Sequence, residues 1–226
     1  MPDYEQVPDY EQETGEHYDN LLKAGLNSLV NNTNHLPVSN FFNEVGVEHK
    51  NIIDVGCGIG EIAKLAATKG QWNSYHGIDK GKLVVAEFNK MKLPKAVAKR
   101  ASATKLTGQE DNSKDIVVCL FLLQDLKRED GLKALRELRR VAKHNADALI
   151  GLTINRLEVE EPKRYASPKV KAVVGDKWTF IWNLEEFKAI LASEGFSIVS
   201  VEEVAGSSQK RPRLYVRTRV VKEPTG

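Results

Sequence analysis

The chain has 226 residues and a formal net charge of +2, with 41% hydrophobic and 28% charged residues. This composition is typical of a soluble globular protein of one α/β domain, and the near-neutral charge does not argue for a nucleic-acid partner. No apolar run approaches the roughly 18 residues of a membrane span, and the acidic start is unlike a targeting signal. The two cysteines, Cys57 and Cys119, fall in separate expected elements and indicate neither a disulfide framework nor a metal site. We therefore expect a reduced, cytoplasmic protein that holds no metal and binds no membrane.

The first residues contain a short repeat, because Pro-Asp-Tyr-Glu-Gln at residues 2–6 recurs at residues 8–12. We expect residues 1–16 to form a flexible acidic tail, the alternative being that part of it folds over a ligand pocket. From His17 to Val30 apolar residues recur at helical spacing, and a second helix is expected from Pro37. Residues 17–48 should thus form two helices ahead of the first strand.

The stretch from Asn51 to Ala63 is the most informative part of the chain. An apolar, β-branched run contains Asp54 near its end and is followed by glycines at 56, 58 and 60 and then by an apolar-periodic segment. This order predicts a strand, a tight turn and the start of a helix. The turn suits a dinucleotide site, a methyl-transfer site or no ligand at all. The dinucleotide fingerprint needs Gly-x-Gly-x-x-Gly, whereas Glu61 stands at the third glycine position. Asp54 would repel a pyrophosphate but could receive a cationic ammonium group.

The motif Asp54-Val-Gly56-Cys57-Gly58-Ile-Gly60 resembles the first motif of class I S-adenosylmethionine-dependent methyltransferases. The resemblance covers residues 50–204 and implies an α/β fold: a Rossmann-like three-layer α/β/α sandwich with a seven-stranded, mostly parallel sheet and an antiparallel last strand. It implies one domain over residues 17–222, with S-adenosyl-L-methionine, and the product S-adenosyl-L-homocysteine, bound across the carboxyl ends of the first, second and fourth strands. Asp54 and the loop of Gly56, Cys57, Gly58 and Gly60 would hold the methionine part.

The second strand is expected from Trp72 to Ile78 and leads into Asp79. A carboxylate at the end of this strand can accept two hydrogen bonds from a ribose diol. Lys80 would border the adenine, a solvated lysine being the alternative. After a third strand at residues 96–101, the family usually places an acid that meets the adenine amino group. Ser102 stands here instead, followed by Ala103, and serine brings a hydrogen bond but no charge.

A continuous apolar run from Ile116 to Phe121 predicts a strand buried on both faces, as in a parallel sheet. The resemblance implies that Leu120, Phe121 and Gln124 flank the cofactor. Many small-molecule methyltransferases carry a histidine just after this strand, whereas this chain carries Gln124-Asp125. Asp125 either caps the next helix or belongs to the active site.

The next helix is expected from Arg128 to Ala142, with an apolar stripe and an outward charged face. The usual Pro-Gly-Gly turn is replaced by residues 143–147, in which Asn145 can adopt the left-handed conformation. The fifth strand should run from Ala148 to Ile154.

Residues 155–182 form an expected insertion with a basic stretch and an aromatic cluster. The cluster consists of Trp178, Phe180 and Trp182. In this family the segment commonly builds the acceptor pocket, and an aromatic wall can hold a flat or cationic acceptor. Packing in the protein core is the alternative.

Asn183 should cap a helix over residues 184–193, followed by a strand at 197–204. The final strand, residues 213–220, alternates basic and apolar residues, which places the apolar set on the sheet and the arginines outward. By resemblance it is the antiparallel strand. Its basic face is either solvated or meets an acidic partner or RNA.

Methyl transfer needs a base only if the acceptor must lose a proton. The catalytic candidates are His17, Tyr18, Asp125 and His144. Tyr18 is also a cofactor-binding candidate, because a tyrosine in the leading helices of this family often reaches the methionine carboxylate; a core tyrosine is the alternative. The sequence favours a small-molecule acceptor methylated on O, N or C. The alternatives are an RNA or protein methyltransferase and a non-catalytic cofactor-binding module. Nothing in the sequence indicates the oligomeric state.

Overall fold

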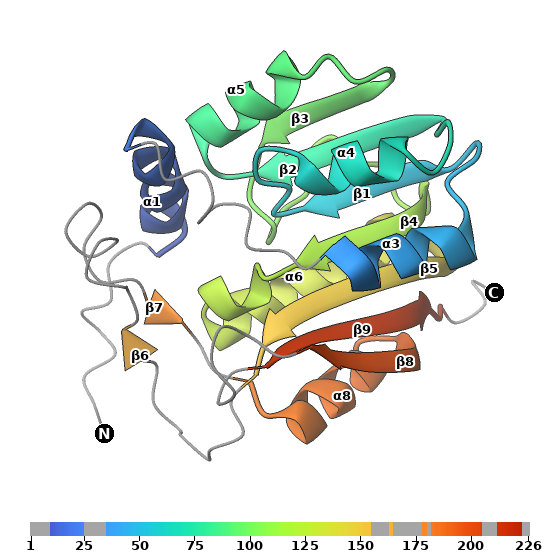
Figure 1. Ribbon diagram of the computed structural model, residues 1–226. Helices are drawn as coiled ribbons and strands as arrows, with labels where there is room; N and C mark the ends of the chain where they lie inside the picture. The colour runs from blue at the N-terminus through green and yellow to red at the C-terminus, as the bar shows by residue number, and fades with distance from the viewer. Residues whose placement is uncertain are drawn as a thin grey trace.

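A seven-stranded sheet organises the computed structural model, which describes residues 10–24, 35–154, 163–164, 178–179, 182–204 and 212–222. The spatial order of the strands is β3-β2-β1-β4-β5-β9-β8 (Figure 1). The strands are β1 (Asn51–Val55), β2 (Ser74–Asp79), β3 (Ala96–Arg100), β4 (Lys114–Leu120), β5 (Ala142–Thr153), β8 (Phe196–Val204) and β9 (Arg213–Val220).

The strand directions confirm the predicted fold class. Strands β3, β2, β1, β4 and β5 pair in parallel, and β9 pairs antiparallel with both β5 and β8. The order reverses direction between β1 and β4, so the loops after these two strands diverge and leave a crevice at their carboxyl ends. That edge of the sheet is where a ligand site is expected.

Helices cover both faces of this sheet (Figure 1). On one face lie α3 (His35–Val45), α4 (Glu61–Ala67) and α5 (Lys82–Lys90), and on the other lie α6 (Arg128–Val141) and α8 (Leu184–Ser193). Helix α1 (Tyr10–Lys23) and the paired strands β6 (Lys163–Arg164) and β7 (Trp178–Thr179) lie beyond the carboxyl ends of the parallel strands (Figure 1). The short 3-10 turn η2 (Leu123–Asp125) follows the carboxyl end of β4.

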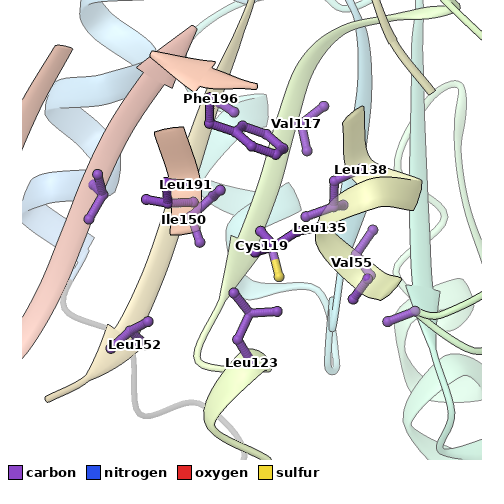
Figure 2. Close-up of a cluster of buried hydrophobic side chains, with 14 of the residues drawn as sticks. Val55, Val117, Cys119, Leu123, Leu135, Leu138, Ile150, Leu152, Leu191 and Phe196 are labelled. Atoms are coloured by element: carbon purple, nitrogen blue, oxygen red, sulfur yellow. The ribbon is translucent and has the colours of Figure 1, made fainter. Parts of the chain in front are cut away.

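The apolar pattern of β4 explains the two cores, because alternate side chains of a strand point to opposite faces. Ile116 and Val118 pack under α3 and α4, whereas Val117 and Cys119 pack under α6. Figure 2 shows the second of these clusters, which includes Val117, Cys119, Leu135, Leu138, Leu191 and Phe196. The sheet is thus buried on both sides, as a parallel sheet requires.

Two predicted boundaries are wrong. Helix α1 begins at Tyr10, so the predicted flexible tail over residues 1–16 overlaps its first two turns; residues 1–9 and 25–34 lie outside the described residues. Strand β5 begins at Ala142 and not at Ala148, because residues 142–147 pair with the start of β4 through an irregular register. Asn145 has φ 62° within that irregularity, which confirms the predicted left-handed residue.

The expected outward basic face of β9 is only partly exposed. The apolar set of the strand is buried, as predicted, but Tyr215 on the opposite face is also buried, with 2% of its surface exposed. Arg217 is ion-paired with Glu44 of α3 and lies 3.5 Å from Asp147. Within the described residues, much of the basic face is therefore occupied by internal contacts.

The N-terminus of α8 is capped by Asn183, as the sequence predicted. The Asn183 side chain accepts hydrogen bonds from the backbone N–H groups of Glu185 (2.9 Å) and Glu186 (3.3 Å). Replacing Asn183 by Ala should lower the free energy of unfolding by about 1 kcal/mol, because these N–H groups lose their acceptor. Asn183→Asp keeps an acceptor and should stay near wild type in urea denaturation. Equal stability of the Ala and Asp variants would contradict the capping role.

Candidate functional site

The glycine turn after β1 is held close to the end of β2. The backbone N–H groups of Gly56 and Cys57 both donate to the carbonyl of Ile78. Gly56 and Gly60 have φ values of 80° and 89°, which L side chains rarely adopt. A Cβ on Gly60 would also lie 2.2 Å from the Met91 Cε atom. The turn therefore keeps bare backbone at the carboxyl end of the sheet.

Cys57 of this turn has a packing role in the structure. Its side chain is buried, and its Sγ atom occupies the space in which a Cβ of Gly77 would lie, at 2.8 Å. Burial raises the pKa of the Cys57 thiol well above its usual value, and Asp79 and Asp54 raise it further. A thiol with such a pKa is a poor nucleophile. Cys57 therefore packs against Gly77 and is not a candidate nucleophile.

Asp54 is a buried acid at the end of β1, with 1% of its surface exposed. One carboxylate oxygen accepts a hydrogen bond of 2.8 Å from the Tyr75 hydroxyl. Desolvation raises the pKa of Asp54 to about 7; the Tyr75 hydrogen bond opposes this shift, and the nearby Asp79 adds to it. A buried carboxylate of this kind is stabilised in its ionised form when a cation lies beside it.

Asp79 connects the turn after β1 to the helix after β2. Its Oδ2 atom accepts from the N–H of Gly58 (3.0 Å) and its Oδ1 atom from the N–H of Gly81 (2.9 Å). Burial raises the pKa of Asp79, whereas these backbone hydrogen bonds lower it. The structure thus brings Asp54, Asp79 and the glycine turn together, as the sequence predicted.

Helix α1 places Tyr18 and His17 over the same edge of the sheet. The Tyr18 hydroxyl donates to the Oδ2 atom of Asp125 at 2.8 Å. The His17 ring packs edge-on against the Tyr18 ring, with 5.5 Å between the centroids. Asp125 itself is 1% exposed and lies in η2, directly after β4. Three of the four catalytic candidates are therefore neighbours.

The segment after β4 contains a strained aromatic residue. Phe121 has φ 59°, an unusual value for a bulky side chain, and its N–H donates to the carbonyl of Gly151 at 2.7 Å. Its ring packs edge-on against Tyr215, and the Arg213 guanidinium lies 5.6 Å from its centroid. Strained residues of this kind cluster at functional sites, and the cofactor contact of Phe121 stays a prediction.

The neighbours of Phe121 are held by other contacts. Leu120 is buried beneath the loop with 8% of its surface exposed. The Gln124 side-chain oxygen accepts from the backbone N–H of Thr153 at 2.6 Å, which ties the end of β4 to the end of β5. Gln124 therefore has a structural contact of its own beside Phe121, and its place next to the cofactor stays a prediction.

The residues predicted to lie beside the adenine make mainly local or core contacts in the structure. The Ser102 hydroxyl lies 2.8 Å from the Thr104 hydroxyl and accepts from the Thr104 N–H, within a local turn. Ala103 is buried against the core beside Val55 and Ile78. Lys80 is half-buried, and its carbonyl accepts from the Arg100 side chain. These residues all follow β2 or β3 at the expected edge.

His144 lies at the wrong end of the sheet for the predicted catalytic role. It lies near the amino end of β5, which runs parallel to β4. Asp54 and Asp79 lie at the carboxyl ends of β1 and β2, at the opposite edge of the sheet. It is exposed and accepts from the backbone N–H of Lys222. His144 is therefore removed from the candidates.

Trp182 has the core-packing role that was the alternative for the aromatic cluster. It is 1% exposed, its ring packs edge-on against Phe187, and the Arg128 guanidinium lies 4.2 Å from its centroid. Phe180 lies outside the described residues, and only the backbone of Trp178, in β7, is described. Strand β7 lies against η2, so its backbone approaches the site.

Two residues that contact the site were missed at the sequence level. Tyr75 holds Asp54, and Asp19 of α1 accepts from the N–H groups of Lys82, Leu83 and Val84. A buried tyrosine needs a hydrogen-bond partner, so Tyr75 could have been proposed for Asp54. Asp19 carries no such signal, because its partners are 63 to 65 residues away.

Other parts of the described structure give no second site of this kind. A cavity of about 340 Å³ is lined by Arg136, Arg139, Arg140 and Lys222 at the amino ends of the strands, but Arg136 and Arg140 are ion-paired there with Glu194, Glu137 and Asp111. The described His, Cys, Asp and Glu side chains form no group of three suited to a metal ion. None of the described helices is long and apolar enough to cross a membrane.

Comparison with known proteins also indicates a methyltransferase domain. Residues 53–150 match the family model described as a methyltransferase domain. The chain is 29% identical over 152 residues to the ubiquinone biosynthesis O-methyltransferase of Pseudomonas paraeruginosa, covering 66% of this chain and 60% of that protein. The chain therefore spans about three-fifths of the length of this curated relative.

Many solved structures resemble the fold, and two of them match it over most of the chain. A methyltransferase from Methanosarcina mazei, described as S-adenosylmethionine-dependent, superposes with a TM-score of 0.70 at 19% identity, over 81% of this chain and 98% of that one. The 1,6-didemethyltoxoflavin-N1-methyltransferase of Burkholderia thailandensis, solved with S-adenosylhomocysteine, gives 0.73 at 12% identity, over 95% and 90%. At these identities the likeness concerns the fold.

The raised pKa of Asp54 predicts a pH-dependent cost to folding. In the unfolded chain this acid ionises near pH 4, but in the folded protein near 7, so wild-type stability should fall as the pH rises through that window. Asp54→Asn removes the buried charge. We compare the free energy of unfolding of this variant with that of wild type at each pH. The difference in favour of the variant should be about 2–3 kcal/mol larger at pH 8 than at pH 5.

Urea denaturation at both pH values measures this difference. The exposed Asp111→Asn change is the matched control and should follow the wild-type pH dependence. A gain from Asp54→Asn that is the same at pH 5 and pH 8 would show that Asp54 does not titrate in this window.

Proposed function

We propose, from the premise that the chain belongs to the class I S-adenosylmethionine-dependent methyltransferases, that it transfers a methyl group from S-adenosylmethionine to an O, N or C atom of a small-molecule acceptor. The observation that carries this proposal is the meeting of Asp54, Asp79 and the Gly56–Gly60 turn at the switch point of the sheet. We take the domain to extend from α1 to the end of β9.

The charges at the site fit this cofactor. S-adenosylmethionine, when bound, supplies an electrophilic methyl group on a positively charged sulfonium. Asp54 is buried and pays a desolvation cost when ionised, so an ammonium group beside it would stabilise the carboxylate. The bare backbone of Gly56, Cys57, Gly58 and Gly60 leaves room for the methionine part.

Asp79 is suited to the ribose. Its oxygens accept hydrogen bonds from the backbone N–H groups of Gly58, Lys80 and Gly81. The ribose hydroxyls would donate to a carboxylate that the backbone has already oriented. We assign the adenine to Lys80, Ser102, Ala103, Leu120 and Phe121, with Gln124 beside the cofactor.

The proposed catalytic group is Asp125, with Tyr18 as its partner. Burial and the neighbouring Asp125 raise the pKa of Tyr18 well above its usual value, so its hydroxyl remains a donor. That hydroxyl orients the Asp125 carboxylate, which would accept a proton from an acceptor oxygen or nitrogen. His17 is the second candidate base. The remaining catalysis comes from holding acceptor and methyl group in line, about 3–3.5 Å apart.

We place the acceptor between α1 and the insertion of residues 155–182, with Trp178 and Phe180 as its aromatic wall. The approach of β7 to η2 supports this placement. The Pseudomonas relative is named as an O-methyltransferase and the Burkholderia structure as an N-methyltransferase, which supports a small acceptor without selecting the atom. The contacts of Arg217 and Arg219 with acids favour a small molecule over RNA.

Isothermal titration with S-adenosylmethionine, and separately with S-adenosylhomocysteine, tests the proposal. We expect micromolar binding of both ligands, followed by methyl transfer to an acceptor found by screening phenols, amines and carbon acids. A folded protein that binds neither ligand would refute the enzymatic function. Binding of both without transfer to any screened acceptor would favour a non-catalytic module.

Replacing Asp79 by Ala should weaken cofactor binding about 10- to 100-fold, because charge-assisted hydrogen bonds contribute about 1.5–3 kcal/mol. Calorimetry on the folded variant gives the dissociation constant. Asp115→Ala, another strand-end acid but at the amino end of β4, is the matched control. Unchanged affinity of Asp79→Ala would contradict the assignment of the ribose site.

Replacing Trp178 by Ala should reduce turnover of the acceptor more than cofactor affinity, because the aromatic wall is assigned to the acceptor. Steady-state kinetics should show a raised acceptor KM, and calorimetry an unchanged cofactor Kd. The opposite pattern, weaker cofactor binding with normal acceptor kinetics, would move this segment out of the acceptor pocket.

A further inference from the structure

Helix α5 has no cap from its own sequence. A helix leaves the N–H groups of its first turn without intrahelical acceptors, and the N-cap position of α5 is Gly81, which has no side chain. The Asp19 carboxylate of α1 accepts from the next three N–H groups. Oδ2 accepts from Lys82 (2.9 Å), and Oδ1 from Leu83 (2.8 Å) and Val84 (3.2 Å). The cap of α5 is therefore supplied by a different helix.

Gly81 makes this approach possible. A Cβ at that position would lie 2.9 Å from the Asp19 Oδ1 atom and 2.8 Å from the Val84 side chain. Any larger residue would push the carboxylate away from the N–H groups that it caps. Gly81 and Asp19 thus form one structural unit.

The same helix start also holds Asp79, the acid assigned to the ribose. The N–H of Gly81 donates to Asp79, and the following three N–H groups donate to Asp19. The two carboxylates divide the four N–H groups of one helix end, and the charge of Asp19 contributes to the raised pKa of Asp79. A shift of α5 on loss of Asp19 would therefore move the donor that orients Asp79.

Residue 18 of the same helix makes the second attachment, because Tyr18 donates to Asp125 beyond the end of β4. Adjacent residues of α1 thus bind both sides of the candidate site. We propose that Asp19 is a positioning residue, which docks α1 on the N-terminus of α5 and thereby fixes Asp79 for the ribose of the cofactor. This inference rests on the proposed function for its ligand but not for the docking itself.

Three variants separate the cap from other effects of residue 19. Asp19→Ala removes the acceptors, and Asp19→Asn keeps one acceptor oxygen for Leu83 and Val84. Asn20→Ala changes the next residue of α1, which is exposed, and is the matched control. Asp19→Ala should raise the Kd for S-adenosylmethionine about tenfold, Asp19→Asn should stay within about threefold of wild type, and Asn20→Ala should be unchanged.

A double-mutant cycle with Asp79→Ala tests whether Asp19 acts through Asp79. If it does, Asp19→Ala should have little further effect on the Kd when Asp79 is already absent. Docking is measured without cofactor, by the rate of tryptic cleavage after Lys23 near the end of α1. That rate should rise in Asp19→Ala and not in Asn20→Ala.

The outcomes are distinguishable. Equal Kd values for wild type and Asp19→Ala, or fully additive effects in the cycle, would overturn the inference, even if the Ala variant melted at a lower temperature. A wild-type protein that binds no S-adenosylmethionine would refute the proposed function, whereas Asp19-dependent cleavage in that same protein would still support the docking of α1.

Discussion

The rest of the site depends on the two carboxylates where β1 and β2 end, of which Asp54 is buried and Asp79 half-buried. Asp54 has almost no contact with water, and its carboxylate accepts a hydrogen bond from the neutral hydroxyl of Tyr75. An ionised acid in such a place is costly unless a cation approaches it. The glycines of the following turn leave bare backbone directly after that acid. The fold therefore accepts a cost in stability in order to keep a negative site at the switch point of the sheet.

The second acid extends this arrangement to the helices. Asp79 receives N–H groups from the turn after β1 and from the start of α5, so one carboxylate joins two loops. Asp19 of α1 accepts a hydrogen bond from the same N-terminus of α5 and so attaches α1 to it. The elements at the carboxyl edge are thus connected mainly by backbone N–H groups that converge on acidic side chains, and not by a hydrophobic interface alone.

What could be predicted from the sequence was local. The strand-acid-glycine motif, the Asn183 cap and the left-handed Asn145 each depend on neighbouring residues, and all three are confirmed. The early start of α1 was missed because its first two turns lack an apolar stripe. The partners of Asp19 were missed because a hydrogen bond across more than 60 residues leaves no local pattern. His144 was an avoidable error, since a residue before a parallel strand lies at the opposite edge from the site.

Under the proposed function, the two acids Asp54 and Asp79 have a consequence for turnover. Methyl transfer converts a sulfonium into a neutral thioether, so the ligand loses one positive charge while Asp54 and Asp79 stay in place. The site would then hold a product that carries one positive charge fewer than the donor. The loss of this charge would weaken the attraction of the ligand to the two acids, while the contacts of its ammonium group and ribose remain, and would so favour exchange of product for fresh donor.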